Sequence, residues 1–320
     1  MKGKIVNKAF WKDKRVLVTG GAGFLGKRLI PKLKRLDANI LVPRSKKFDL
    51  RKEEDVDKLF KTFLPDIVIH MAVDGGGINY MKDHAGSIYY NNIMVNTLTS
   101  EKSRQYNVKK FVGIGTICSY PKFTPSPFKE EDLWNGYPEE TNAPYGLAKK
   151  MMFVQTQAYR EEYNFNGIHL LLVNLYGEHD DFDPEFSHVI PALIKKCVDT
   201  IREDRDEIVV WGTGKATREF LYAGDAAEGI LLAAERYDKS DPVNIGAGFE
   251  ISIKDLVDLI VELTGFQGEI IWDTSKPDGQ PRRMLNTSKA EKEFGFKAKT
   301  NFKEGLKKMI EWYLNNESKK

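Results

Sequence analysis

Arg15-Val-Leu-Val-Thr-Gly-Gly-Ala-Gly-Phe-Leu-Gly26 is the stretch that decides the fold of this chain. A short run rich in β-branched residues leads directly into the glycines, and residues 24–36 then carry apolar side chains at helical spacing. Strand, glycine turn and helix in this order allow a close approach of backbone to a pyrophosphate, which also meets the positive end of the helix dipole. The sequence therefore predicts a dinucleotide site that includes Gly20, Gly23, Phe24, Leu25 and Gly26.

Strands and helices continue to alternate beyond this unit. Strand patterns cover residues 39–43, 66–70 and 110–115, and helical patterns cover 53–63 and about 87–106. This rhythm predicts an α/β protein with a Rossmann-type, doubly wound parallel sheet. From about residue 175 the alternation loosens into short strand-like pieces at 208–211 and 243–245 and amphipathic helices at 252–264 and 301–314.

The end of the second strand selects the nicotinamide cofactor. An NAD site usually places a carboxylate there for the ribose 2′-hydroxyl, but this chain has Pro43, Arg44, Ser45, Lys46 and Lys47. Cations at this place suit a 2′-phosphate through charge-assisted hydrogen bonds, so the sequence predicts NADP(H). The alternative is an exposed basic loop without a ligand. Asp49 follows, and we expect it on the adenine side of the cofactor.

Tyr145-Gly-Leu-Ala-Lys149 places a phenol and an ammonium one helical turn apart on the same face. A nearby cation favours the phenolate, which predicts a lowered pKa for Tyr145. A phenol tuned in this way can exchange a proton with a sugar hydroxyl or ketone. On its own, the pair more often marks a solvated helix face than a catalytic site.

Composition excludes several other classes. The net charge of +3 lacks the basic excess typical of a nucleic-acid surface. The two cysteines, Cys118 and Cys197, show no metal-ligand spacing, so we predict no metal site and a reducing compartment. No apolar run approaches the ~20 residues that span a membrane, and the N-terminus lacks a signal-peptide pattern. We expect a cytoplasmic protein.

Several motifs together resemble those of the extended short-chain dehydrogenase/reductase family. They are Thr-Gly-Gly-x-Gly-Phe-x-Gly, a hydroxyl residue after the fourth strand, and Tyr-x-x-x-Lys. Thr116, Tyr145 and Lys149 fall where that family keeps its catalytic triad, with Thr in place of the commoner Ser.

Further motifs are similar to those of GDP-L-fucose synthases and cover almost the whole chain. They are Gly115-Thr-Ile-Cys-Ser-Tyr-Pro121, Glu140-Thr-Asn-Ala-Pro-Tyr-Gly146, Asn174-Leu-Tyr-Gly177, Ser187-His-Val-Ile-Pro-Ala-Leu193, Val210-Trp-Gly-Thr-Gly214, Arg218-Glu-Phe-Leu221 and Ser275-Lys-Pro-Asp-Gly279. The resemblance implies epimerisation of GDP-4-keto-6-deoxy-mannose at C3 and C5, followed by reduction of C4 with NADPH. It also implies an NADP-binding Rossmann domain over 1–175 with a returning segment at about 213–245. The smaller α/β domain for the nucleotide sugar would comprise 176–212 and 246–320.

The resemblance assigns roles to individual residues. Cys118 and His188 would be the epimerase acid and base, since both titrate within reach of neutrality. On an extended segment Thr116 and Cys118 would point the same way; the alternative for Cys118 is a small buried hydrophobe. Tyr145 would protonate the C4 oxygen, Thr116 would hydrogen-bond it, and Lys149 would hold the nicotinamide ribose. The remaining predicted contacts are Ala72 for the cofactor and Asn174, Val189, Lys196, Trp211, Arg218 and Asp278 for the GDP-sugar.

One segment departs from the fucose-synthase pattern. Where those enzymes usually have Ala-Ala-Lys-Val-Gly-Gly, this chain has Asp74 and Gly75 in place of Lys-Val, which exchanges a cation for an anion. Tyr90-Asn-Asn92 is similar instead to GDP-mannose 3,5-epimerase. A GDP-sugar epimerase, a single-step 4-reductase on a related sugar such as a heptose, and a catalytically silent NADP-binding protein are therefore the alternatives. The resemblance further implies a homodimer through a four-helix bundle built from the helices around 87–106 and 145–163.

Overall fold

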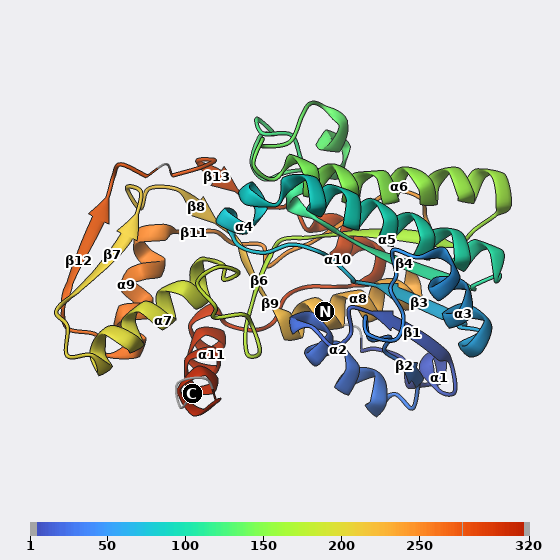
Figure 1. Ribbon diagram of the computed structural model, residues 1–320, viewed down its shortest axis with the longest axis horizontal. Coiled ribbons are helices and arrows are strands. Elements are labelled where there is room, and N and C mark those ends of the chain that lie inside the picture. The colour runs from blue at the N-terminus through green and yellow to red at the C-terminus, as the bar shows by residue number, and fades with distance from the viewer. Residues whose placement is uncertain (1–4, 277, 317–320) are drawn as a thin grey trace.

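A six-stranded parallel sheet forms the centre of the computed structural model, which describes residues 5–276 and 278–316 (Figure 1). Its strand order is β10-β5-β4-β3-β1-β2. The strands are β1 (Arg15–Thr19), β2 (Asn39–Leu41), β3 (Ile67–His70), β4 (Lys110–Thr116), β5 (Gly167–Leu172) and β10 (Val243–Ile245). The predicted Rossmann-type fold is confirmed.

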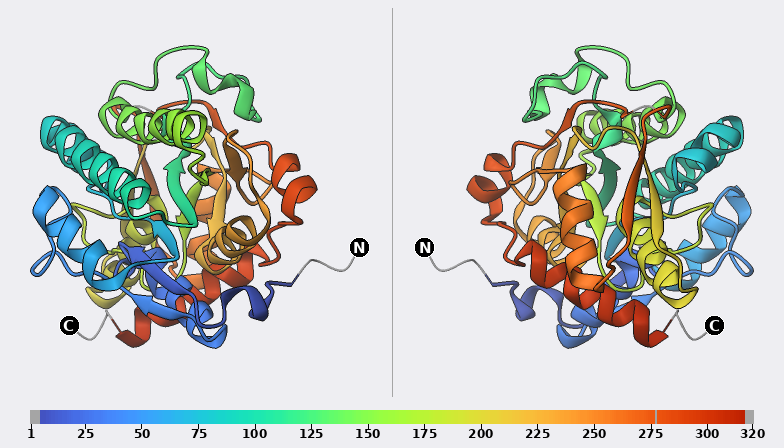
Figure 2. Two further views of the ribbon diagram at one scale, coloured as in Figure 1. Left: turned by 90° about the vertical axis from the view of Figure 1, so that its right-hand side faces the viewer. Right: turned by 90° about the vertical axis from the view of Figure 1, so that its left-hand side faces the viewer.

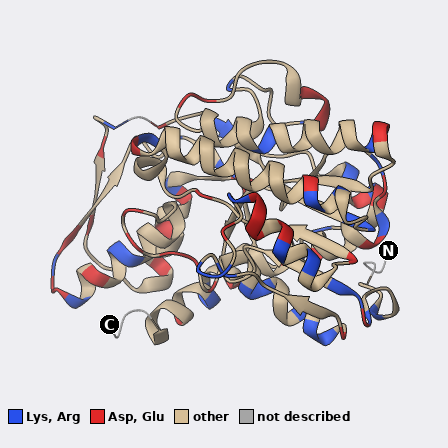
Figure 3. Cartoon of the chain, turned by 45° about the vertical axis from the view of Figure 1, so that its right-hand side comes forward, with Lys and Arg blue, Asp and Glu red and all other residues tan. Residues whose placement is uncertain are grey.

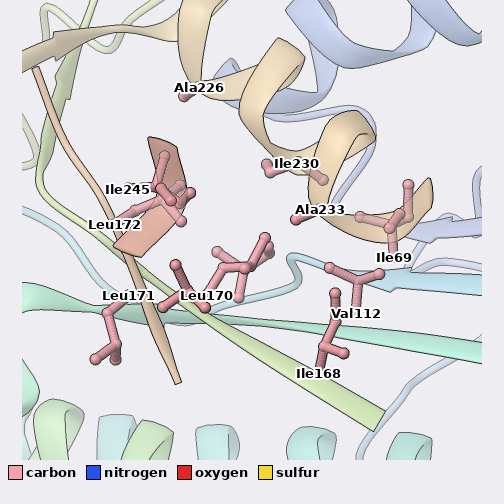
Figure 4. Packing of buried hydrophobic residues seen from close by; sticks show 14 of the residues in the cluster. Ile69, Val112, Ile168, Leu170, Leu171, Leu172, Ala226, Ile230, Ala233 and Ile245 are labelled. Carbon is pink, nitrogen blue, oxygen red and sulfur yellow. The ribbon is translucent and has the colours of Figure 1, made fainter. Parts of the chain in front are cut away.

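Helices cover both faces of this sheet (Figure 2). One face packs against α3 (Glu53–Phe63), α5 (Ala85–Gln105) and α6 (Ala143–Tyr163), and the other against α2 (Phe24–Arg35), α8 (Ala223–Arg236) and α10 (Ser288–Phe294). Strands buried on both faces need nearly continuous apolar sequence, which explains their composition. Figure 4 shows the α8 side of this core, where Ile230 and Ala233 of the helix lie over Ile69, Val112 and Ile168 of three strands.

A second, smaller unit has a core of its own. It contains α7 (Val189–Arg202), α9 (Ile253–Thr264) and α11 (Phe302–Asn316), and the parallel pair β7 (Glu207–Trp211) and β12 (Glu269–Asp273), seen at the left of Figure 1. Short strands join the two units: β6 (Asn174–Tyr176) pairs with β9 (Phe220–Tyr222), and β8 (Thr217–Arg218) lies between β11 (Ile251–Ser252) and β13 (Arg282–Arg283).

The remaining elements are short. They are α1 (Lys8–Trp11), α4 (Ile78–Asp83) and the 3₁₀ turns η1 (Ile117–Ser119) and η2 (Glu130–Trp134). Acidic and basic side chains are interspersed over the fold (Figure 3). Within the described ranges no helix is both long enough and apolar enough to cross a membrane.

Strand register brings three loops to one edge of the sheet. Thr19 pairs with His70, and His70 with Gly113, so β1, β3 and β4 end close together. The glycine turn, the loop at residues 71–77 and η1 follow these strand ends directly. In open parallel sheets this is the edge where ligands bind.

Candidate active site

The glycine turn after β1 is shaped for close approach of backbone. Gly20 has a φ of +69°, and a Cβ there would lie 2.8 Å from the Ala72 nitrogen. A Cβ at Gly26 would lie 2.2 Å from the Gly21 oxygen. Residue 26 must therefore be glycine for α2 to lie this close to the turn. Gly23 caps α2 without a side-chain hydrogen bond, which leaves the first helical N–H groups for an anion. The residues fit the pyrophosphate of a dinucleotide.

The loop after β2 presents exposed cations. Arg44, Lys46 and Lys47 are all exposed there, in line with a site for a 2′-phosphate. Asp49 instead accepts hydrogen bonds from Arg51 Nε at 2.9 Å and Nη2 at 2.8 Å, and this partner holds the pKa of the carboxyl far below its usual range. The Asp49 carboxylate is therefore hydrogen-bonded to Arg51, and its contact with the adenine side of the cofactor stays a prediction.

Thr116, Tyr145 and Lys149 converge where β4 ends and α6 begins. Lys149 is buried and donates to the Ala72 oxygen at 3.4 Å, which places it beside the glycine turn. Burial lowers the pKa of Lys149 to about 8. For Tyr145, burial raises the pKa, the neighbouring Cys118 adds to that rise, and a hydrogen bond with Thr116 opposes it. The predicted lowering of the Tyr145 pKa is therefore wrong for the protein without ligands, because desolvation of the phenolate dominates.

Cys118 reaches this group by a turn of the chain. The segment is the 3₁₀ turn η1 and not extended, and the Thr116 hydroxyl caps it by accepting the Cys118 N–H at 3.2 Å. α6 comes very close, because a Cβ at Gly146 would lie 2.3 Å from the Cys118 oxygen. Glycine beside Tyr145 is thus what lets the phenol approach η1.

Arg283 is a site residue that the sequence did not reveal. Its Nη2 donates to Cys118 Sγ at 3.2 Å, while the Asn142 Oδ1 lies 3.8 Å from the same sulfur. The strand β13 carries Arg283 to this place from a distance of 165 residues along the chain. Its only signal in the sequence is its position four residues beyond the Ser275–Gly279 motif.

His188 lies on another element, as the N-cap of α7. Its side chain is open to solvent, yet protein surrounds it on most sides; this partial desolvation lowers its pKa, and the charge of Asp181 opposes the shift. Among the described residues, no hydrogen bond joins its ring to Cys118 or Tyr145. The pairing of His188 with Cys118 therefore stays a prediction.

Arg218 lies beside Arg283 across the β8–β13 pair. Its guanidinium donates to the carbonyl oxygens of Thr217, Gln280 and Asp278, and burial together with the charge of Arg283 lowers its pKa to about 10. Two adjacent cations, one of them largely desolvated, have the chemistry that suits an anionic ligand.

Glu219 fixes these strands. Its carboxylate accepts the N–H groups of Ala247 at 2.6 Å, Gly248 at 2.8 Å and Leu285 at 2.7 Å, although burial raises its pKa to about 7. These bonds tie β8 to the end of β10 and to the segment after β13. The orientation of Arg218 and Arg283 thus depends on one buried carboxylate.

The other predicted substrate residues surround the same short strands. Asn174 donates to the backbone oxygen of Glu219, and Lys196 donates to the backbone oxygen of Val209. The Asp278 carboxylate accepts from the N–H and the hydroxyl of Thr213. Trp211 is 48% exposed, with the Lys276 ammonium 5.5 Å from its ring centroid, so it is not core filler. Val189 is half-buried at the start of α7. Across the part of the chain that the structure describes, no cluster of His, Cys, Asp and Glu could hold a metal ion.

Residues 16–246 match the sequence profile of the NAD dependent epimerase/dehydratase family. The chain belongs to this family. The family membership that the sequence motifs implied is therefore confirmed.

Relatives within the family share nearly the full length. The chain is 37% identical over 312 residues to the probable GDP-L-fucose synthase 1 of Oryza sativa subsp. japonica, covering 96% of this chain and 95% of the relative. A GDP-L-fucose synthetase from Naegleria fowleri bound to NADP superposes with a TM-score of 0.88 at 28% identity, covering 99% and 98%. A GDP-6-OMe-4-keto-L-xylo-heptose reductase from C. jejuni superposes with a TM-score of 0.89 at 29% identity, covering 98% and 99%.

Proposed function

We propose that this protein is an NADP(H)-dependent enzyme that epimerises a GDP-4-keto-6-deoxy-hexose and reduces its C4 ketone. The observation that carries the proposal is the convergence of Thr116, Tyr145, Lys149 and Cys118 beside the glycine turn. This set combines a proton donor for a ketone oxygen with a separate acid or base. A full-length relationship to GDP-L-fucose synthases supports the same chemistry.

The cofactor is NADP(H), bound over the edge of β1, β3 and β4. The glycine turn and the N-terminus of α2 hold its pyrophosphate, and Arg44, Ser45 and Lys46 hold the 2′-phosphate. Lys149 and Ala72 lie beside the turn and serve the nicotinamide ribose. When bound, NADPH supplies the hydride for C4.

Epimerisation requires removal of a proton from the carbon next to the ketone and return of a proton to the opposite face. Cys118 and His188 are the two groups we assign to these transfers at C3 and C5. The electron pair left by the departing proton moves to the ketone oxygen and forms an enolate. The hydroxyls of Thr116 and Tyr145 stabilise that oxygen, an oxyanion-hole-type role.

Reduction uses the same oxygen. As hydride reaches C4, Tyr145 transfers its phenolic proton to the developing alkoxide. The raised pKa of Tyr145 keeps the phenol protonated and ready to donate. A lysine with a lowered pKa, buried one turn away, can then help to restore that proton.

The GDP moiety occupies the short strands between the two units. Arg218 and Arg283 face its phosphates, assisted by Lys196, because guanidinium groups suit bidentate contact with phosphate. Trp211 is exposed enough to pack on the ribose or base. Asn174, Val189 and Asp278 complete this assignment.

A second candidate is a 4-reductase or epimerase acting on a related GDP-sugar, including a heptose. Asp74 in place of the family's Lys, together with likeness to a GDP-heptose reductase, favours it. A catalytically silent protein fits less well, because Thr116, Tyr145 and Lys149 are in place together.

We further propose a homodimer in the cytoplasm, formed through α5 and α6. These helices pack side by side (Figure 1) and still expose large apolar side chains. Those at least partly open to solvent are Tyr89, Tyr90, Met151, Val154 and Tyr163. On its inner face α5 buries polar residues such as Asn92 and Asn96, so its outward aromatic residues favour a second copy as partner.

The deciding experiment is NADPH oxidation with GDP-4-keto-6-deoxy-mannose in deuterated water, with the product examined by NMR. Deuterium at C3 and C5 of a C4-reduced sugar would establish the bifunctional reaction. Reduction without deuterium would leave a single-step 4-reductase. Absence of turnover would reject this substrate, and GDP-heptoses would then be assayed.

A further inference from the structure

Asp74 is half-buried and hydrogen-bonded to three neighbouring side chains. Its carboxylate accepts from the Tyr80 hydroxyl at 2.9 Å and from Asn91 Nδ2 at 2.7 Å. The Asn92 side chain bonds both backbone groups of Asp74, accepting its N–H at 3.1 Å and donating to its oxygen at 2.7 Å. The anion that replaces the lysine of fucose synthases is therefore already engaged and does not reach out as a free charge toward a sugar.

The bonds of Asp74 extend to the loop that carries His188. Tyr80 turns its ring toward Phe186, with centroids 5.0 Å apart. A Cβ at Gly76 would lie 3.2 Å from the Phe186 ring, and a Cβ at Gly77 would lie 2.8 Å from the Ser187 oxygen. The segment from Asp74 to Tyr80 thus packs directly against residues 186–187, and His188 is the next residue and the N-cap of α7.

We propose that Asp74 is a positioning residue for His188, acting through Tyr80 and Phe186. The hydroxyl bond fixes the Tyr80 ring, the ring and the two glycines fix the backbone before His188, and that backbone sets where the imidazole enters the sugar site. This inference rests on the proposed function, in which His188 moves a proton at C3 or C5. It assigns the position at which this chain departs from the fucose-synthase pattern to control of epimerisation and leaves hydride transfer independent of it.

Two substitutions break this connection at different points. Asp74→Ala removes both acceptors, and Tyr80→Phe removes the hydroxyl while keeping the ring against Phe186. Because a displacement of about 1 Å can cost up to ~100-fold, we expect each to slow deuterium incorporation at saturating keto-sugar by about tenfold or more. NADPH affinity should stay at the wild-type value. Asp83→Asn is the control, since Asp83 is exposed on α4, the short helix that also carries Tyr80.

A swap tests the geometry itself. Asp74→Asn combined with Asn91→Asp keeps one amide and one carboxylate facing each other, and the amide oxygen introduced at position 74 can still accept the Tyr80 hydroxyl. The double variant should recover most of the exchange rate that Asp74→Ala loses. Full exchange in Asp74→Ala, or a matching loss of NADPH affinity, would overturn the inference.

A measurement without the sugar separates this inference from the proposed function. Diethyl pyrocarbonate modifies accessible histidines, and the rate at His188 can be followed by peptide mass spectrometry. We expect Asp74→Ala to change that rate severalfold and Asp83→Asn to leave it unchanged. If wild-type protein exchanged no deuterium, the proposed function would fail, while an unchanged modification rate in Asp74→Ala would refute the positioning role.

Discussion

Arg283 donates a hydrogen bond to the sulfur of Cys118 over 3.2 Å, from a strand that lies 165 residues further along the chain. This charged donor is close enough to hydrogen-bond the sulfur while Cys118 takes up or gives up a proton. The second arginine of the pair, Arg218, is held by carbonyl oxygens and lies on the neighbouring strand. Arg283 therefore hydrogen-bonds the sulfur, while both arginines face the site that we assign to the phosphates.

Replacing Arg283 by Met should slow alkylation of Cys118 by iodoacetamide at pH 7 by about tenfold, since the attacking sulfur loses its charged hydrogen-bond donor. Peptide mass spectrometry would follow Cys118 separately from Cys197, which is buried. Arg282→Met is the matched control, because Arg282 is exposed on the same strand and bonds Glu250. Equal alkylation rates in the wild type and Arg283→Met would show that the bond does not activate the sulfur.

Tyr145→Phe should reduce the rate of NADPH oxidation by about 100-fold or more, the usual contribution of a positioned general acid. Deuterium exchange into the keto-sugar should fall less, because Cys118 and His188 remain, and NADPH should bind as before. Stopped-flow fluorescence with the keto-sugar would measure the hydride step. Oxidation at the wild-type rate would remove Tyr145 from the mechanism.

Local patterns predicted the strand and the helix on either side of the glycine turn, while the individual cofactor contacts stay predictions. The turn at Gly20–Gly26 depends on neighbours along the chain, so strand, glycines and helix could be inferred together. The helix predicted at 53–63 is observed at those bounds as α3. Fold class followed from the same alternation, because βαβ units leave few topologies to choose from.

Long-range packing accounts for what the sequence did not reveal. Cys118 was expected on an extended segment, but capping by the Thr116 hydroxyl turns the chain into η1. The Tyr145 pKa depends on burial by the whole fold, and burial raises it where the local Tyr-x-x-x-Lys pattern predicted a lowering. Arg283 meets Cys118 only because β13 pairs with β8, a register between two-residue strands that no periodicity in the sequence specifies.

The cofactor preference should depend on the cations after β2. Arg44→Ala combined with Lys46→Ala should weaken NADPH binding by about tenfold or more while leaving NADH almost unaffected, since hydrogen bonds to charged groups contribute about 1.5–3 kcal/mol. Fluorescence titration of both cofactors gives the ratio. Lys47→Ala is the comparison variant, because it removes a neighbouring exposed cation that packs over the Phe48 ring. Equal losses of affinity for NADPH and NADH would mean that these side chains do not contact the 2′-phosphate.

Val154→Glu should convert the proposed dimer to a monomer. Val154 is 41% exposed on α6, so a charge there costs a single chain little but would be desolvated between two copies. Sedimentation equilibrium gives the mass directly. Val209→Glu, at a valine of 40% exposure on β7, is the control. A wild-type chain that sediments as a monomer would exclude the α5–α6 interface.

Lys149 should make the stability of the ligand-free protein depend on alkaline pH. Its folded pKa of about 8 lies below the ordinary 10.5, so between these values the unfolded chain binds more protons and stability rises with pH. From pH 7 to pH 9.5 this lysine alone should add about 2 kcal/mol to the free energy of unfolding. Urea titrations of the wild type and Lys149→Met at both pH values isolate that rise as their difference, with the exposed Lys61→Met as control. The same difference at both pH values would mean that Lys149 keeps its proton in the fold, and a role in returning the proton to Tyr145 would then be untenable.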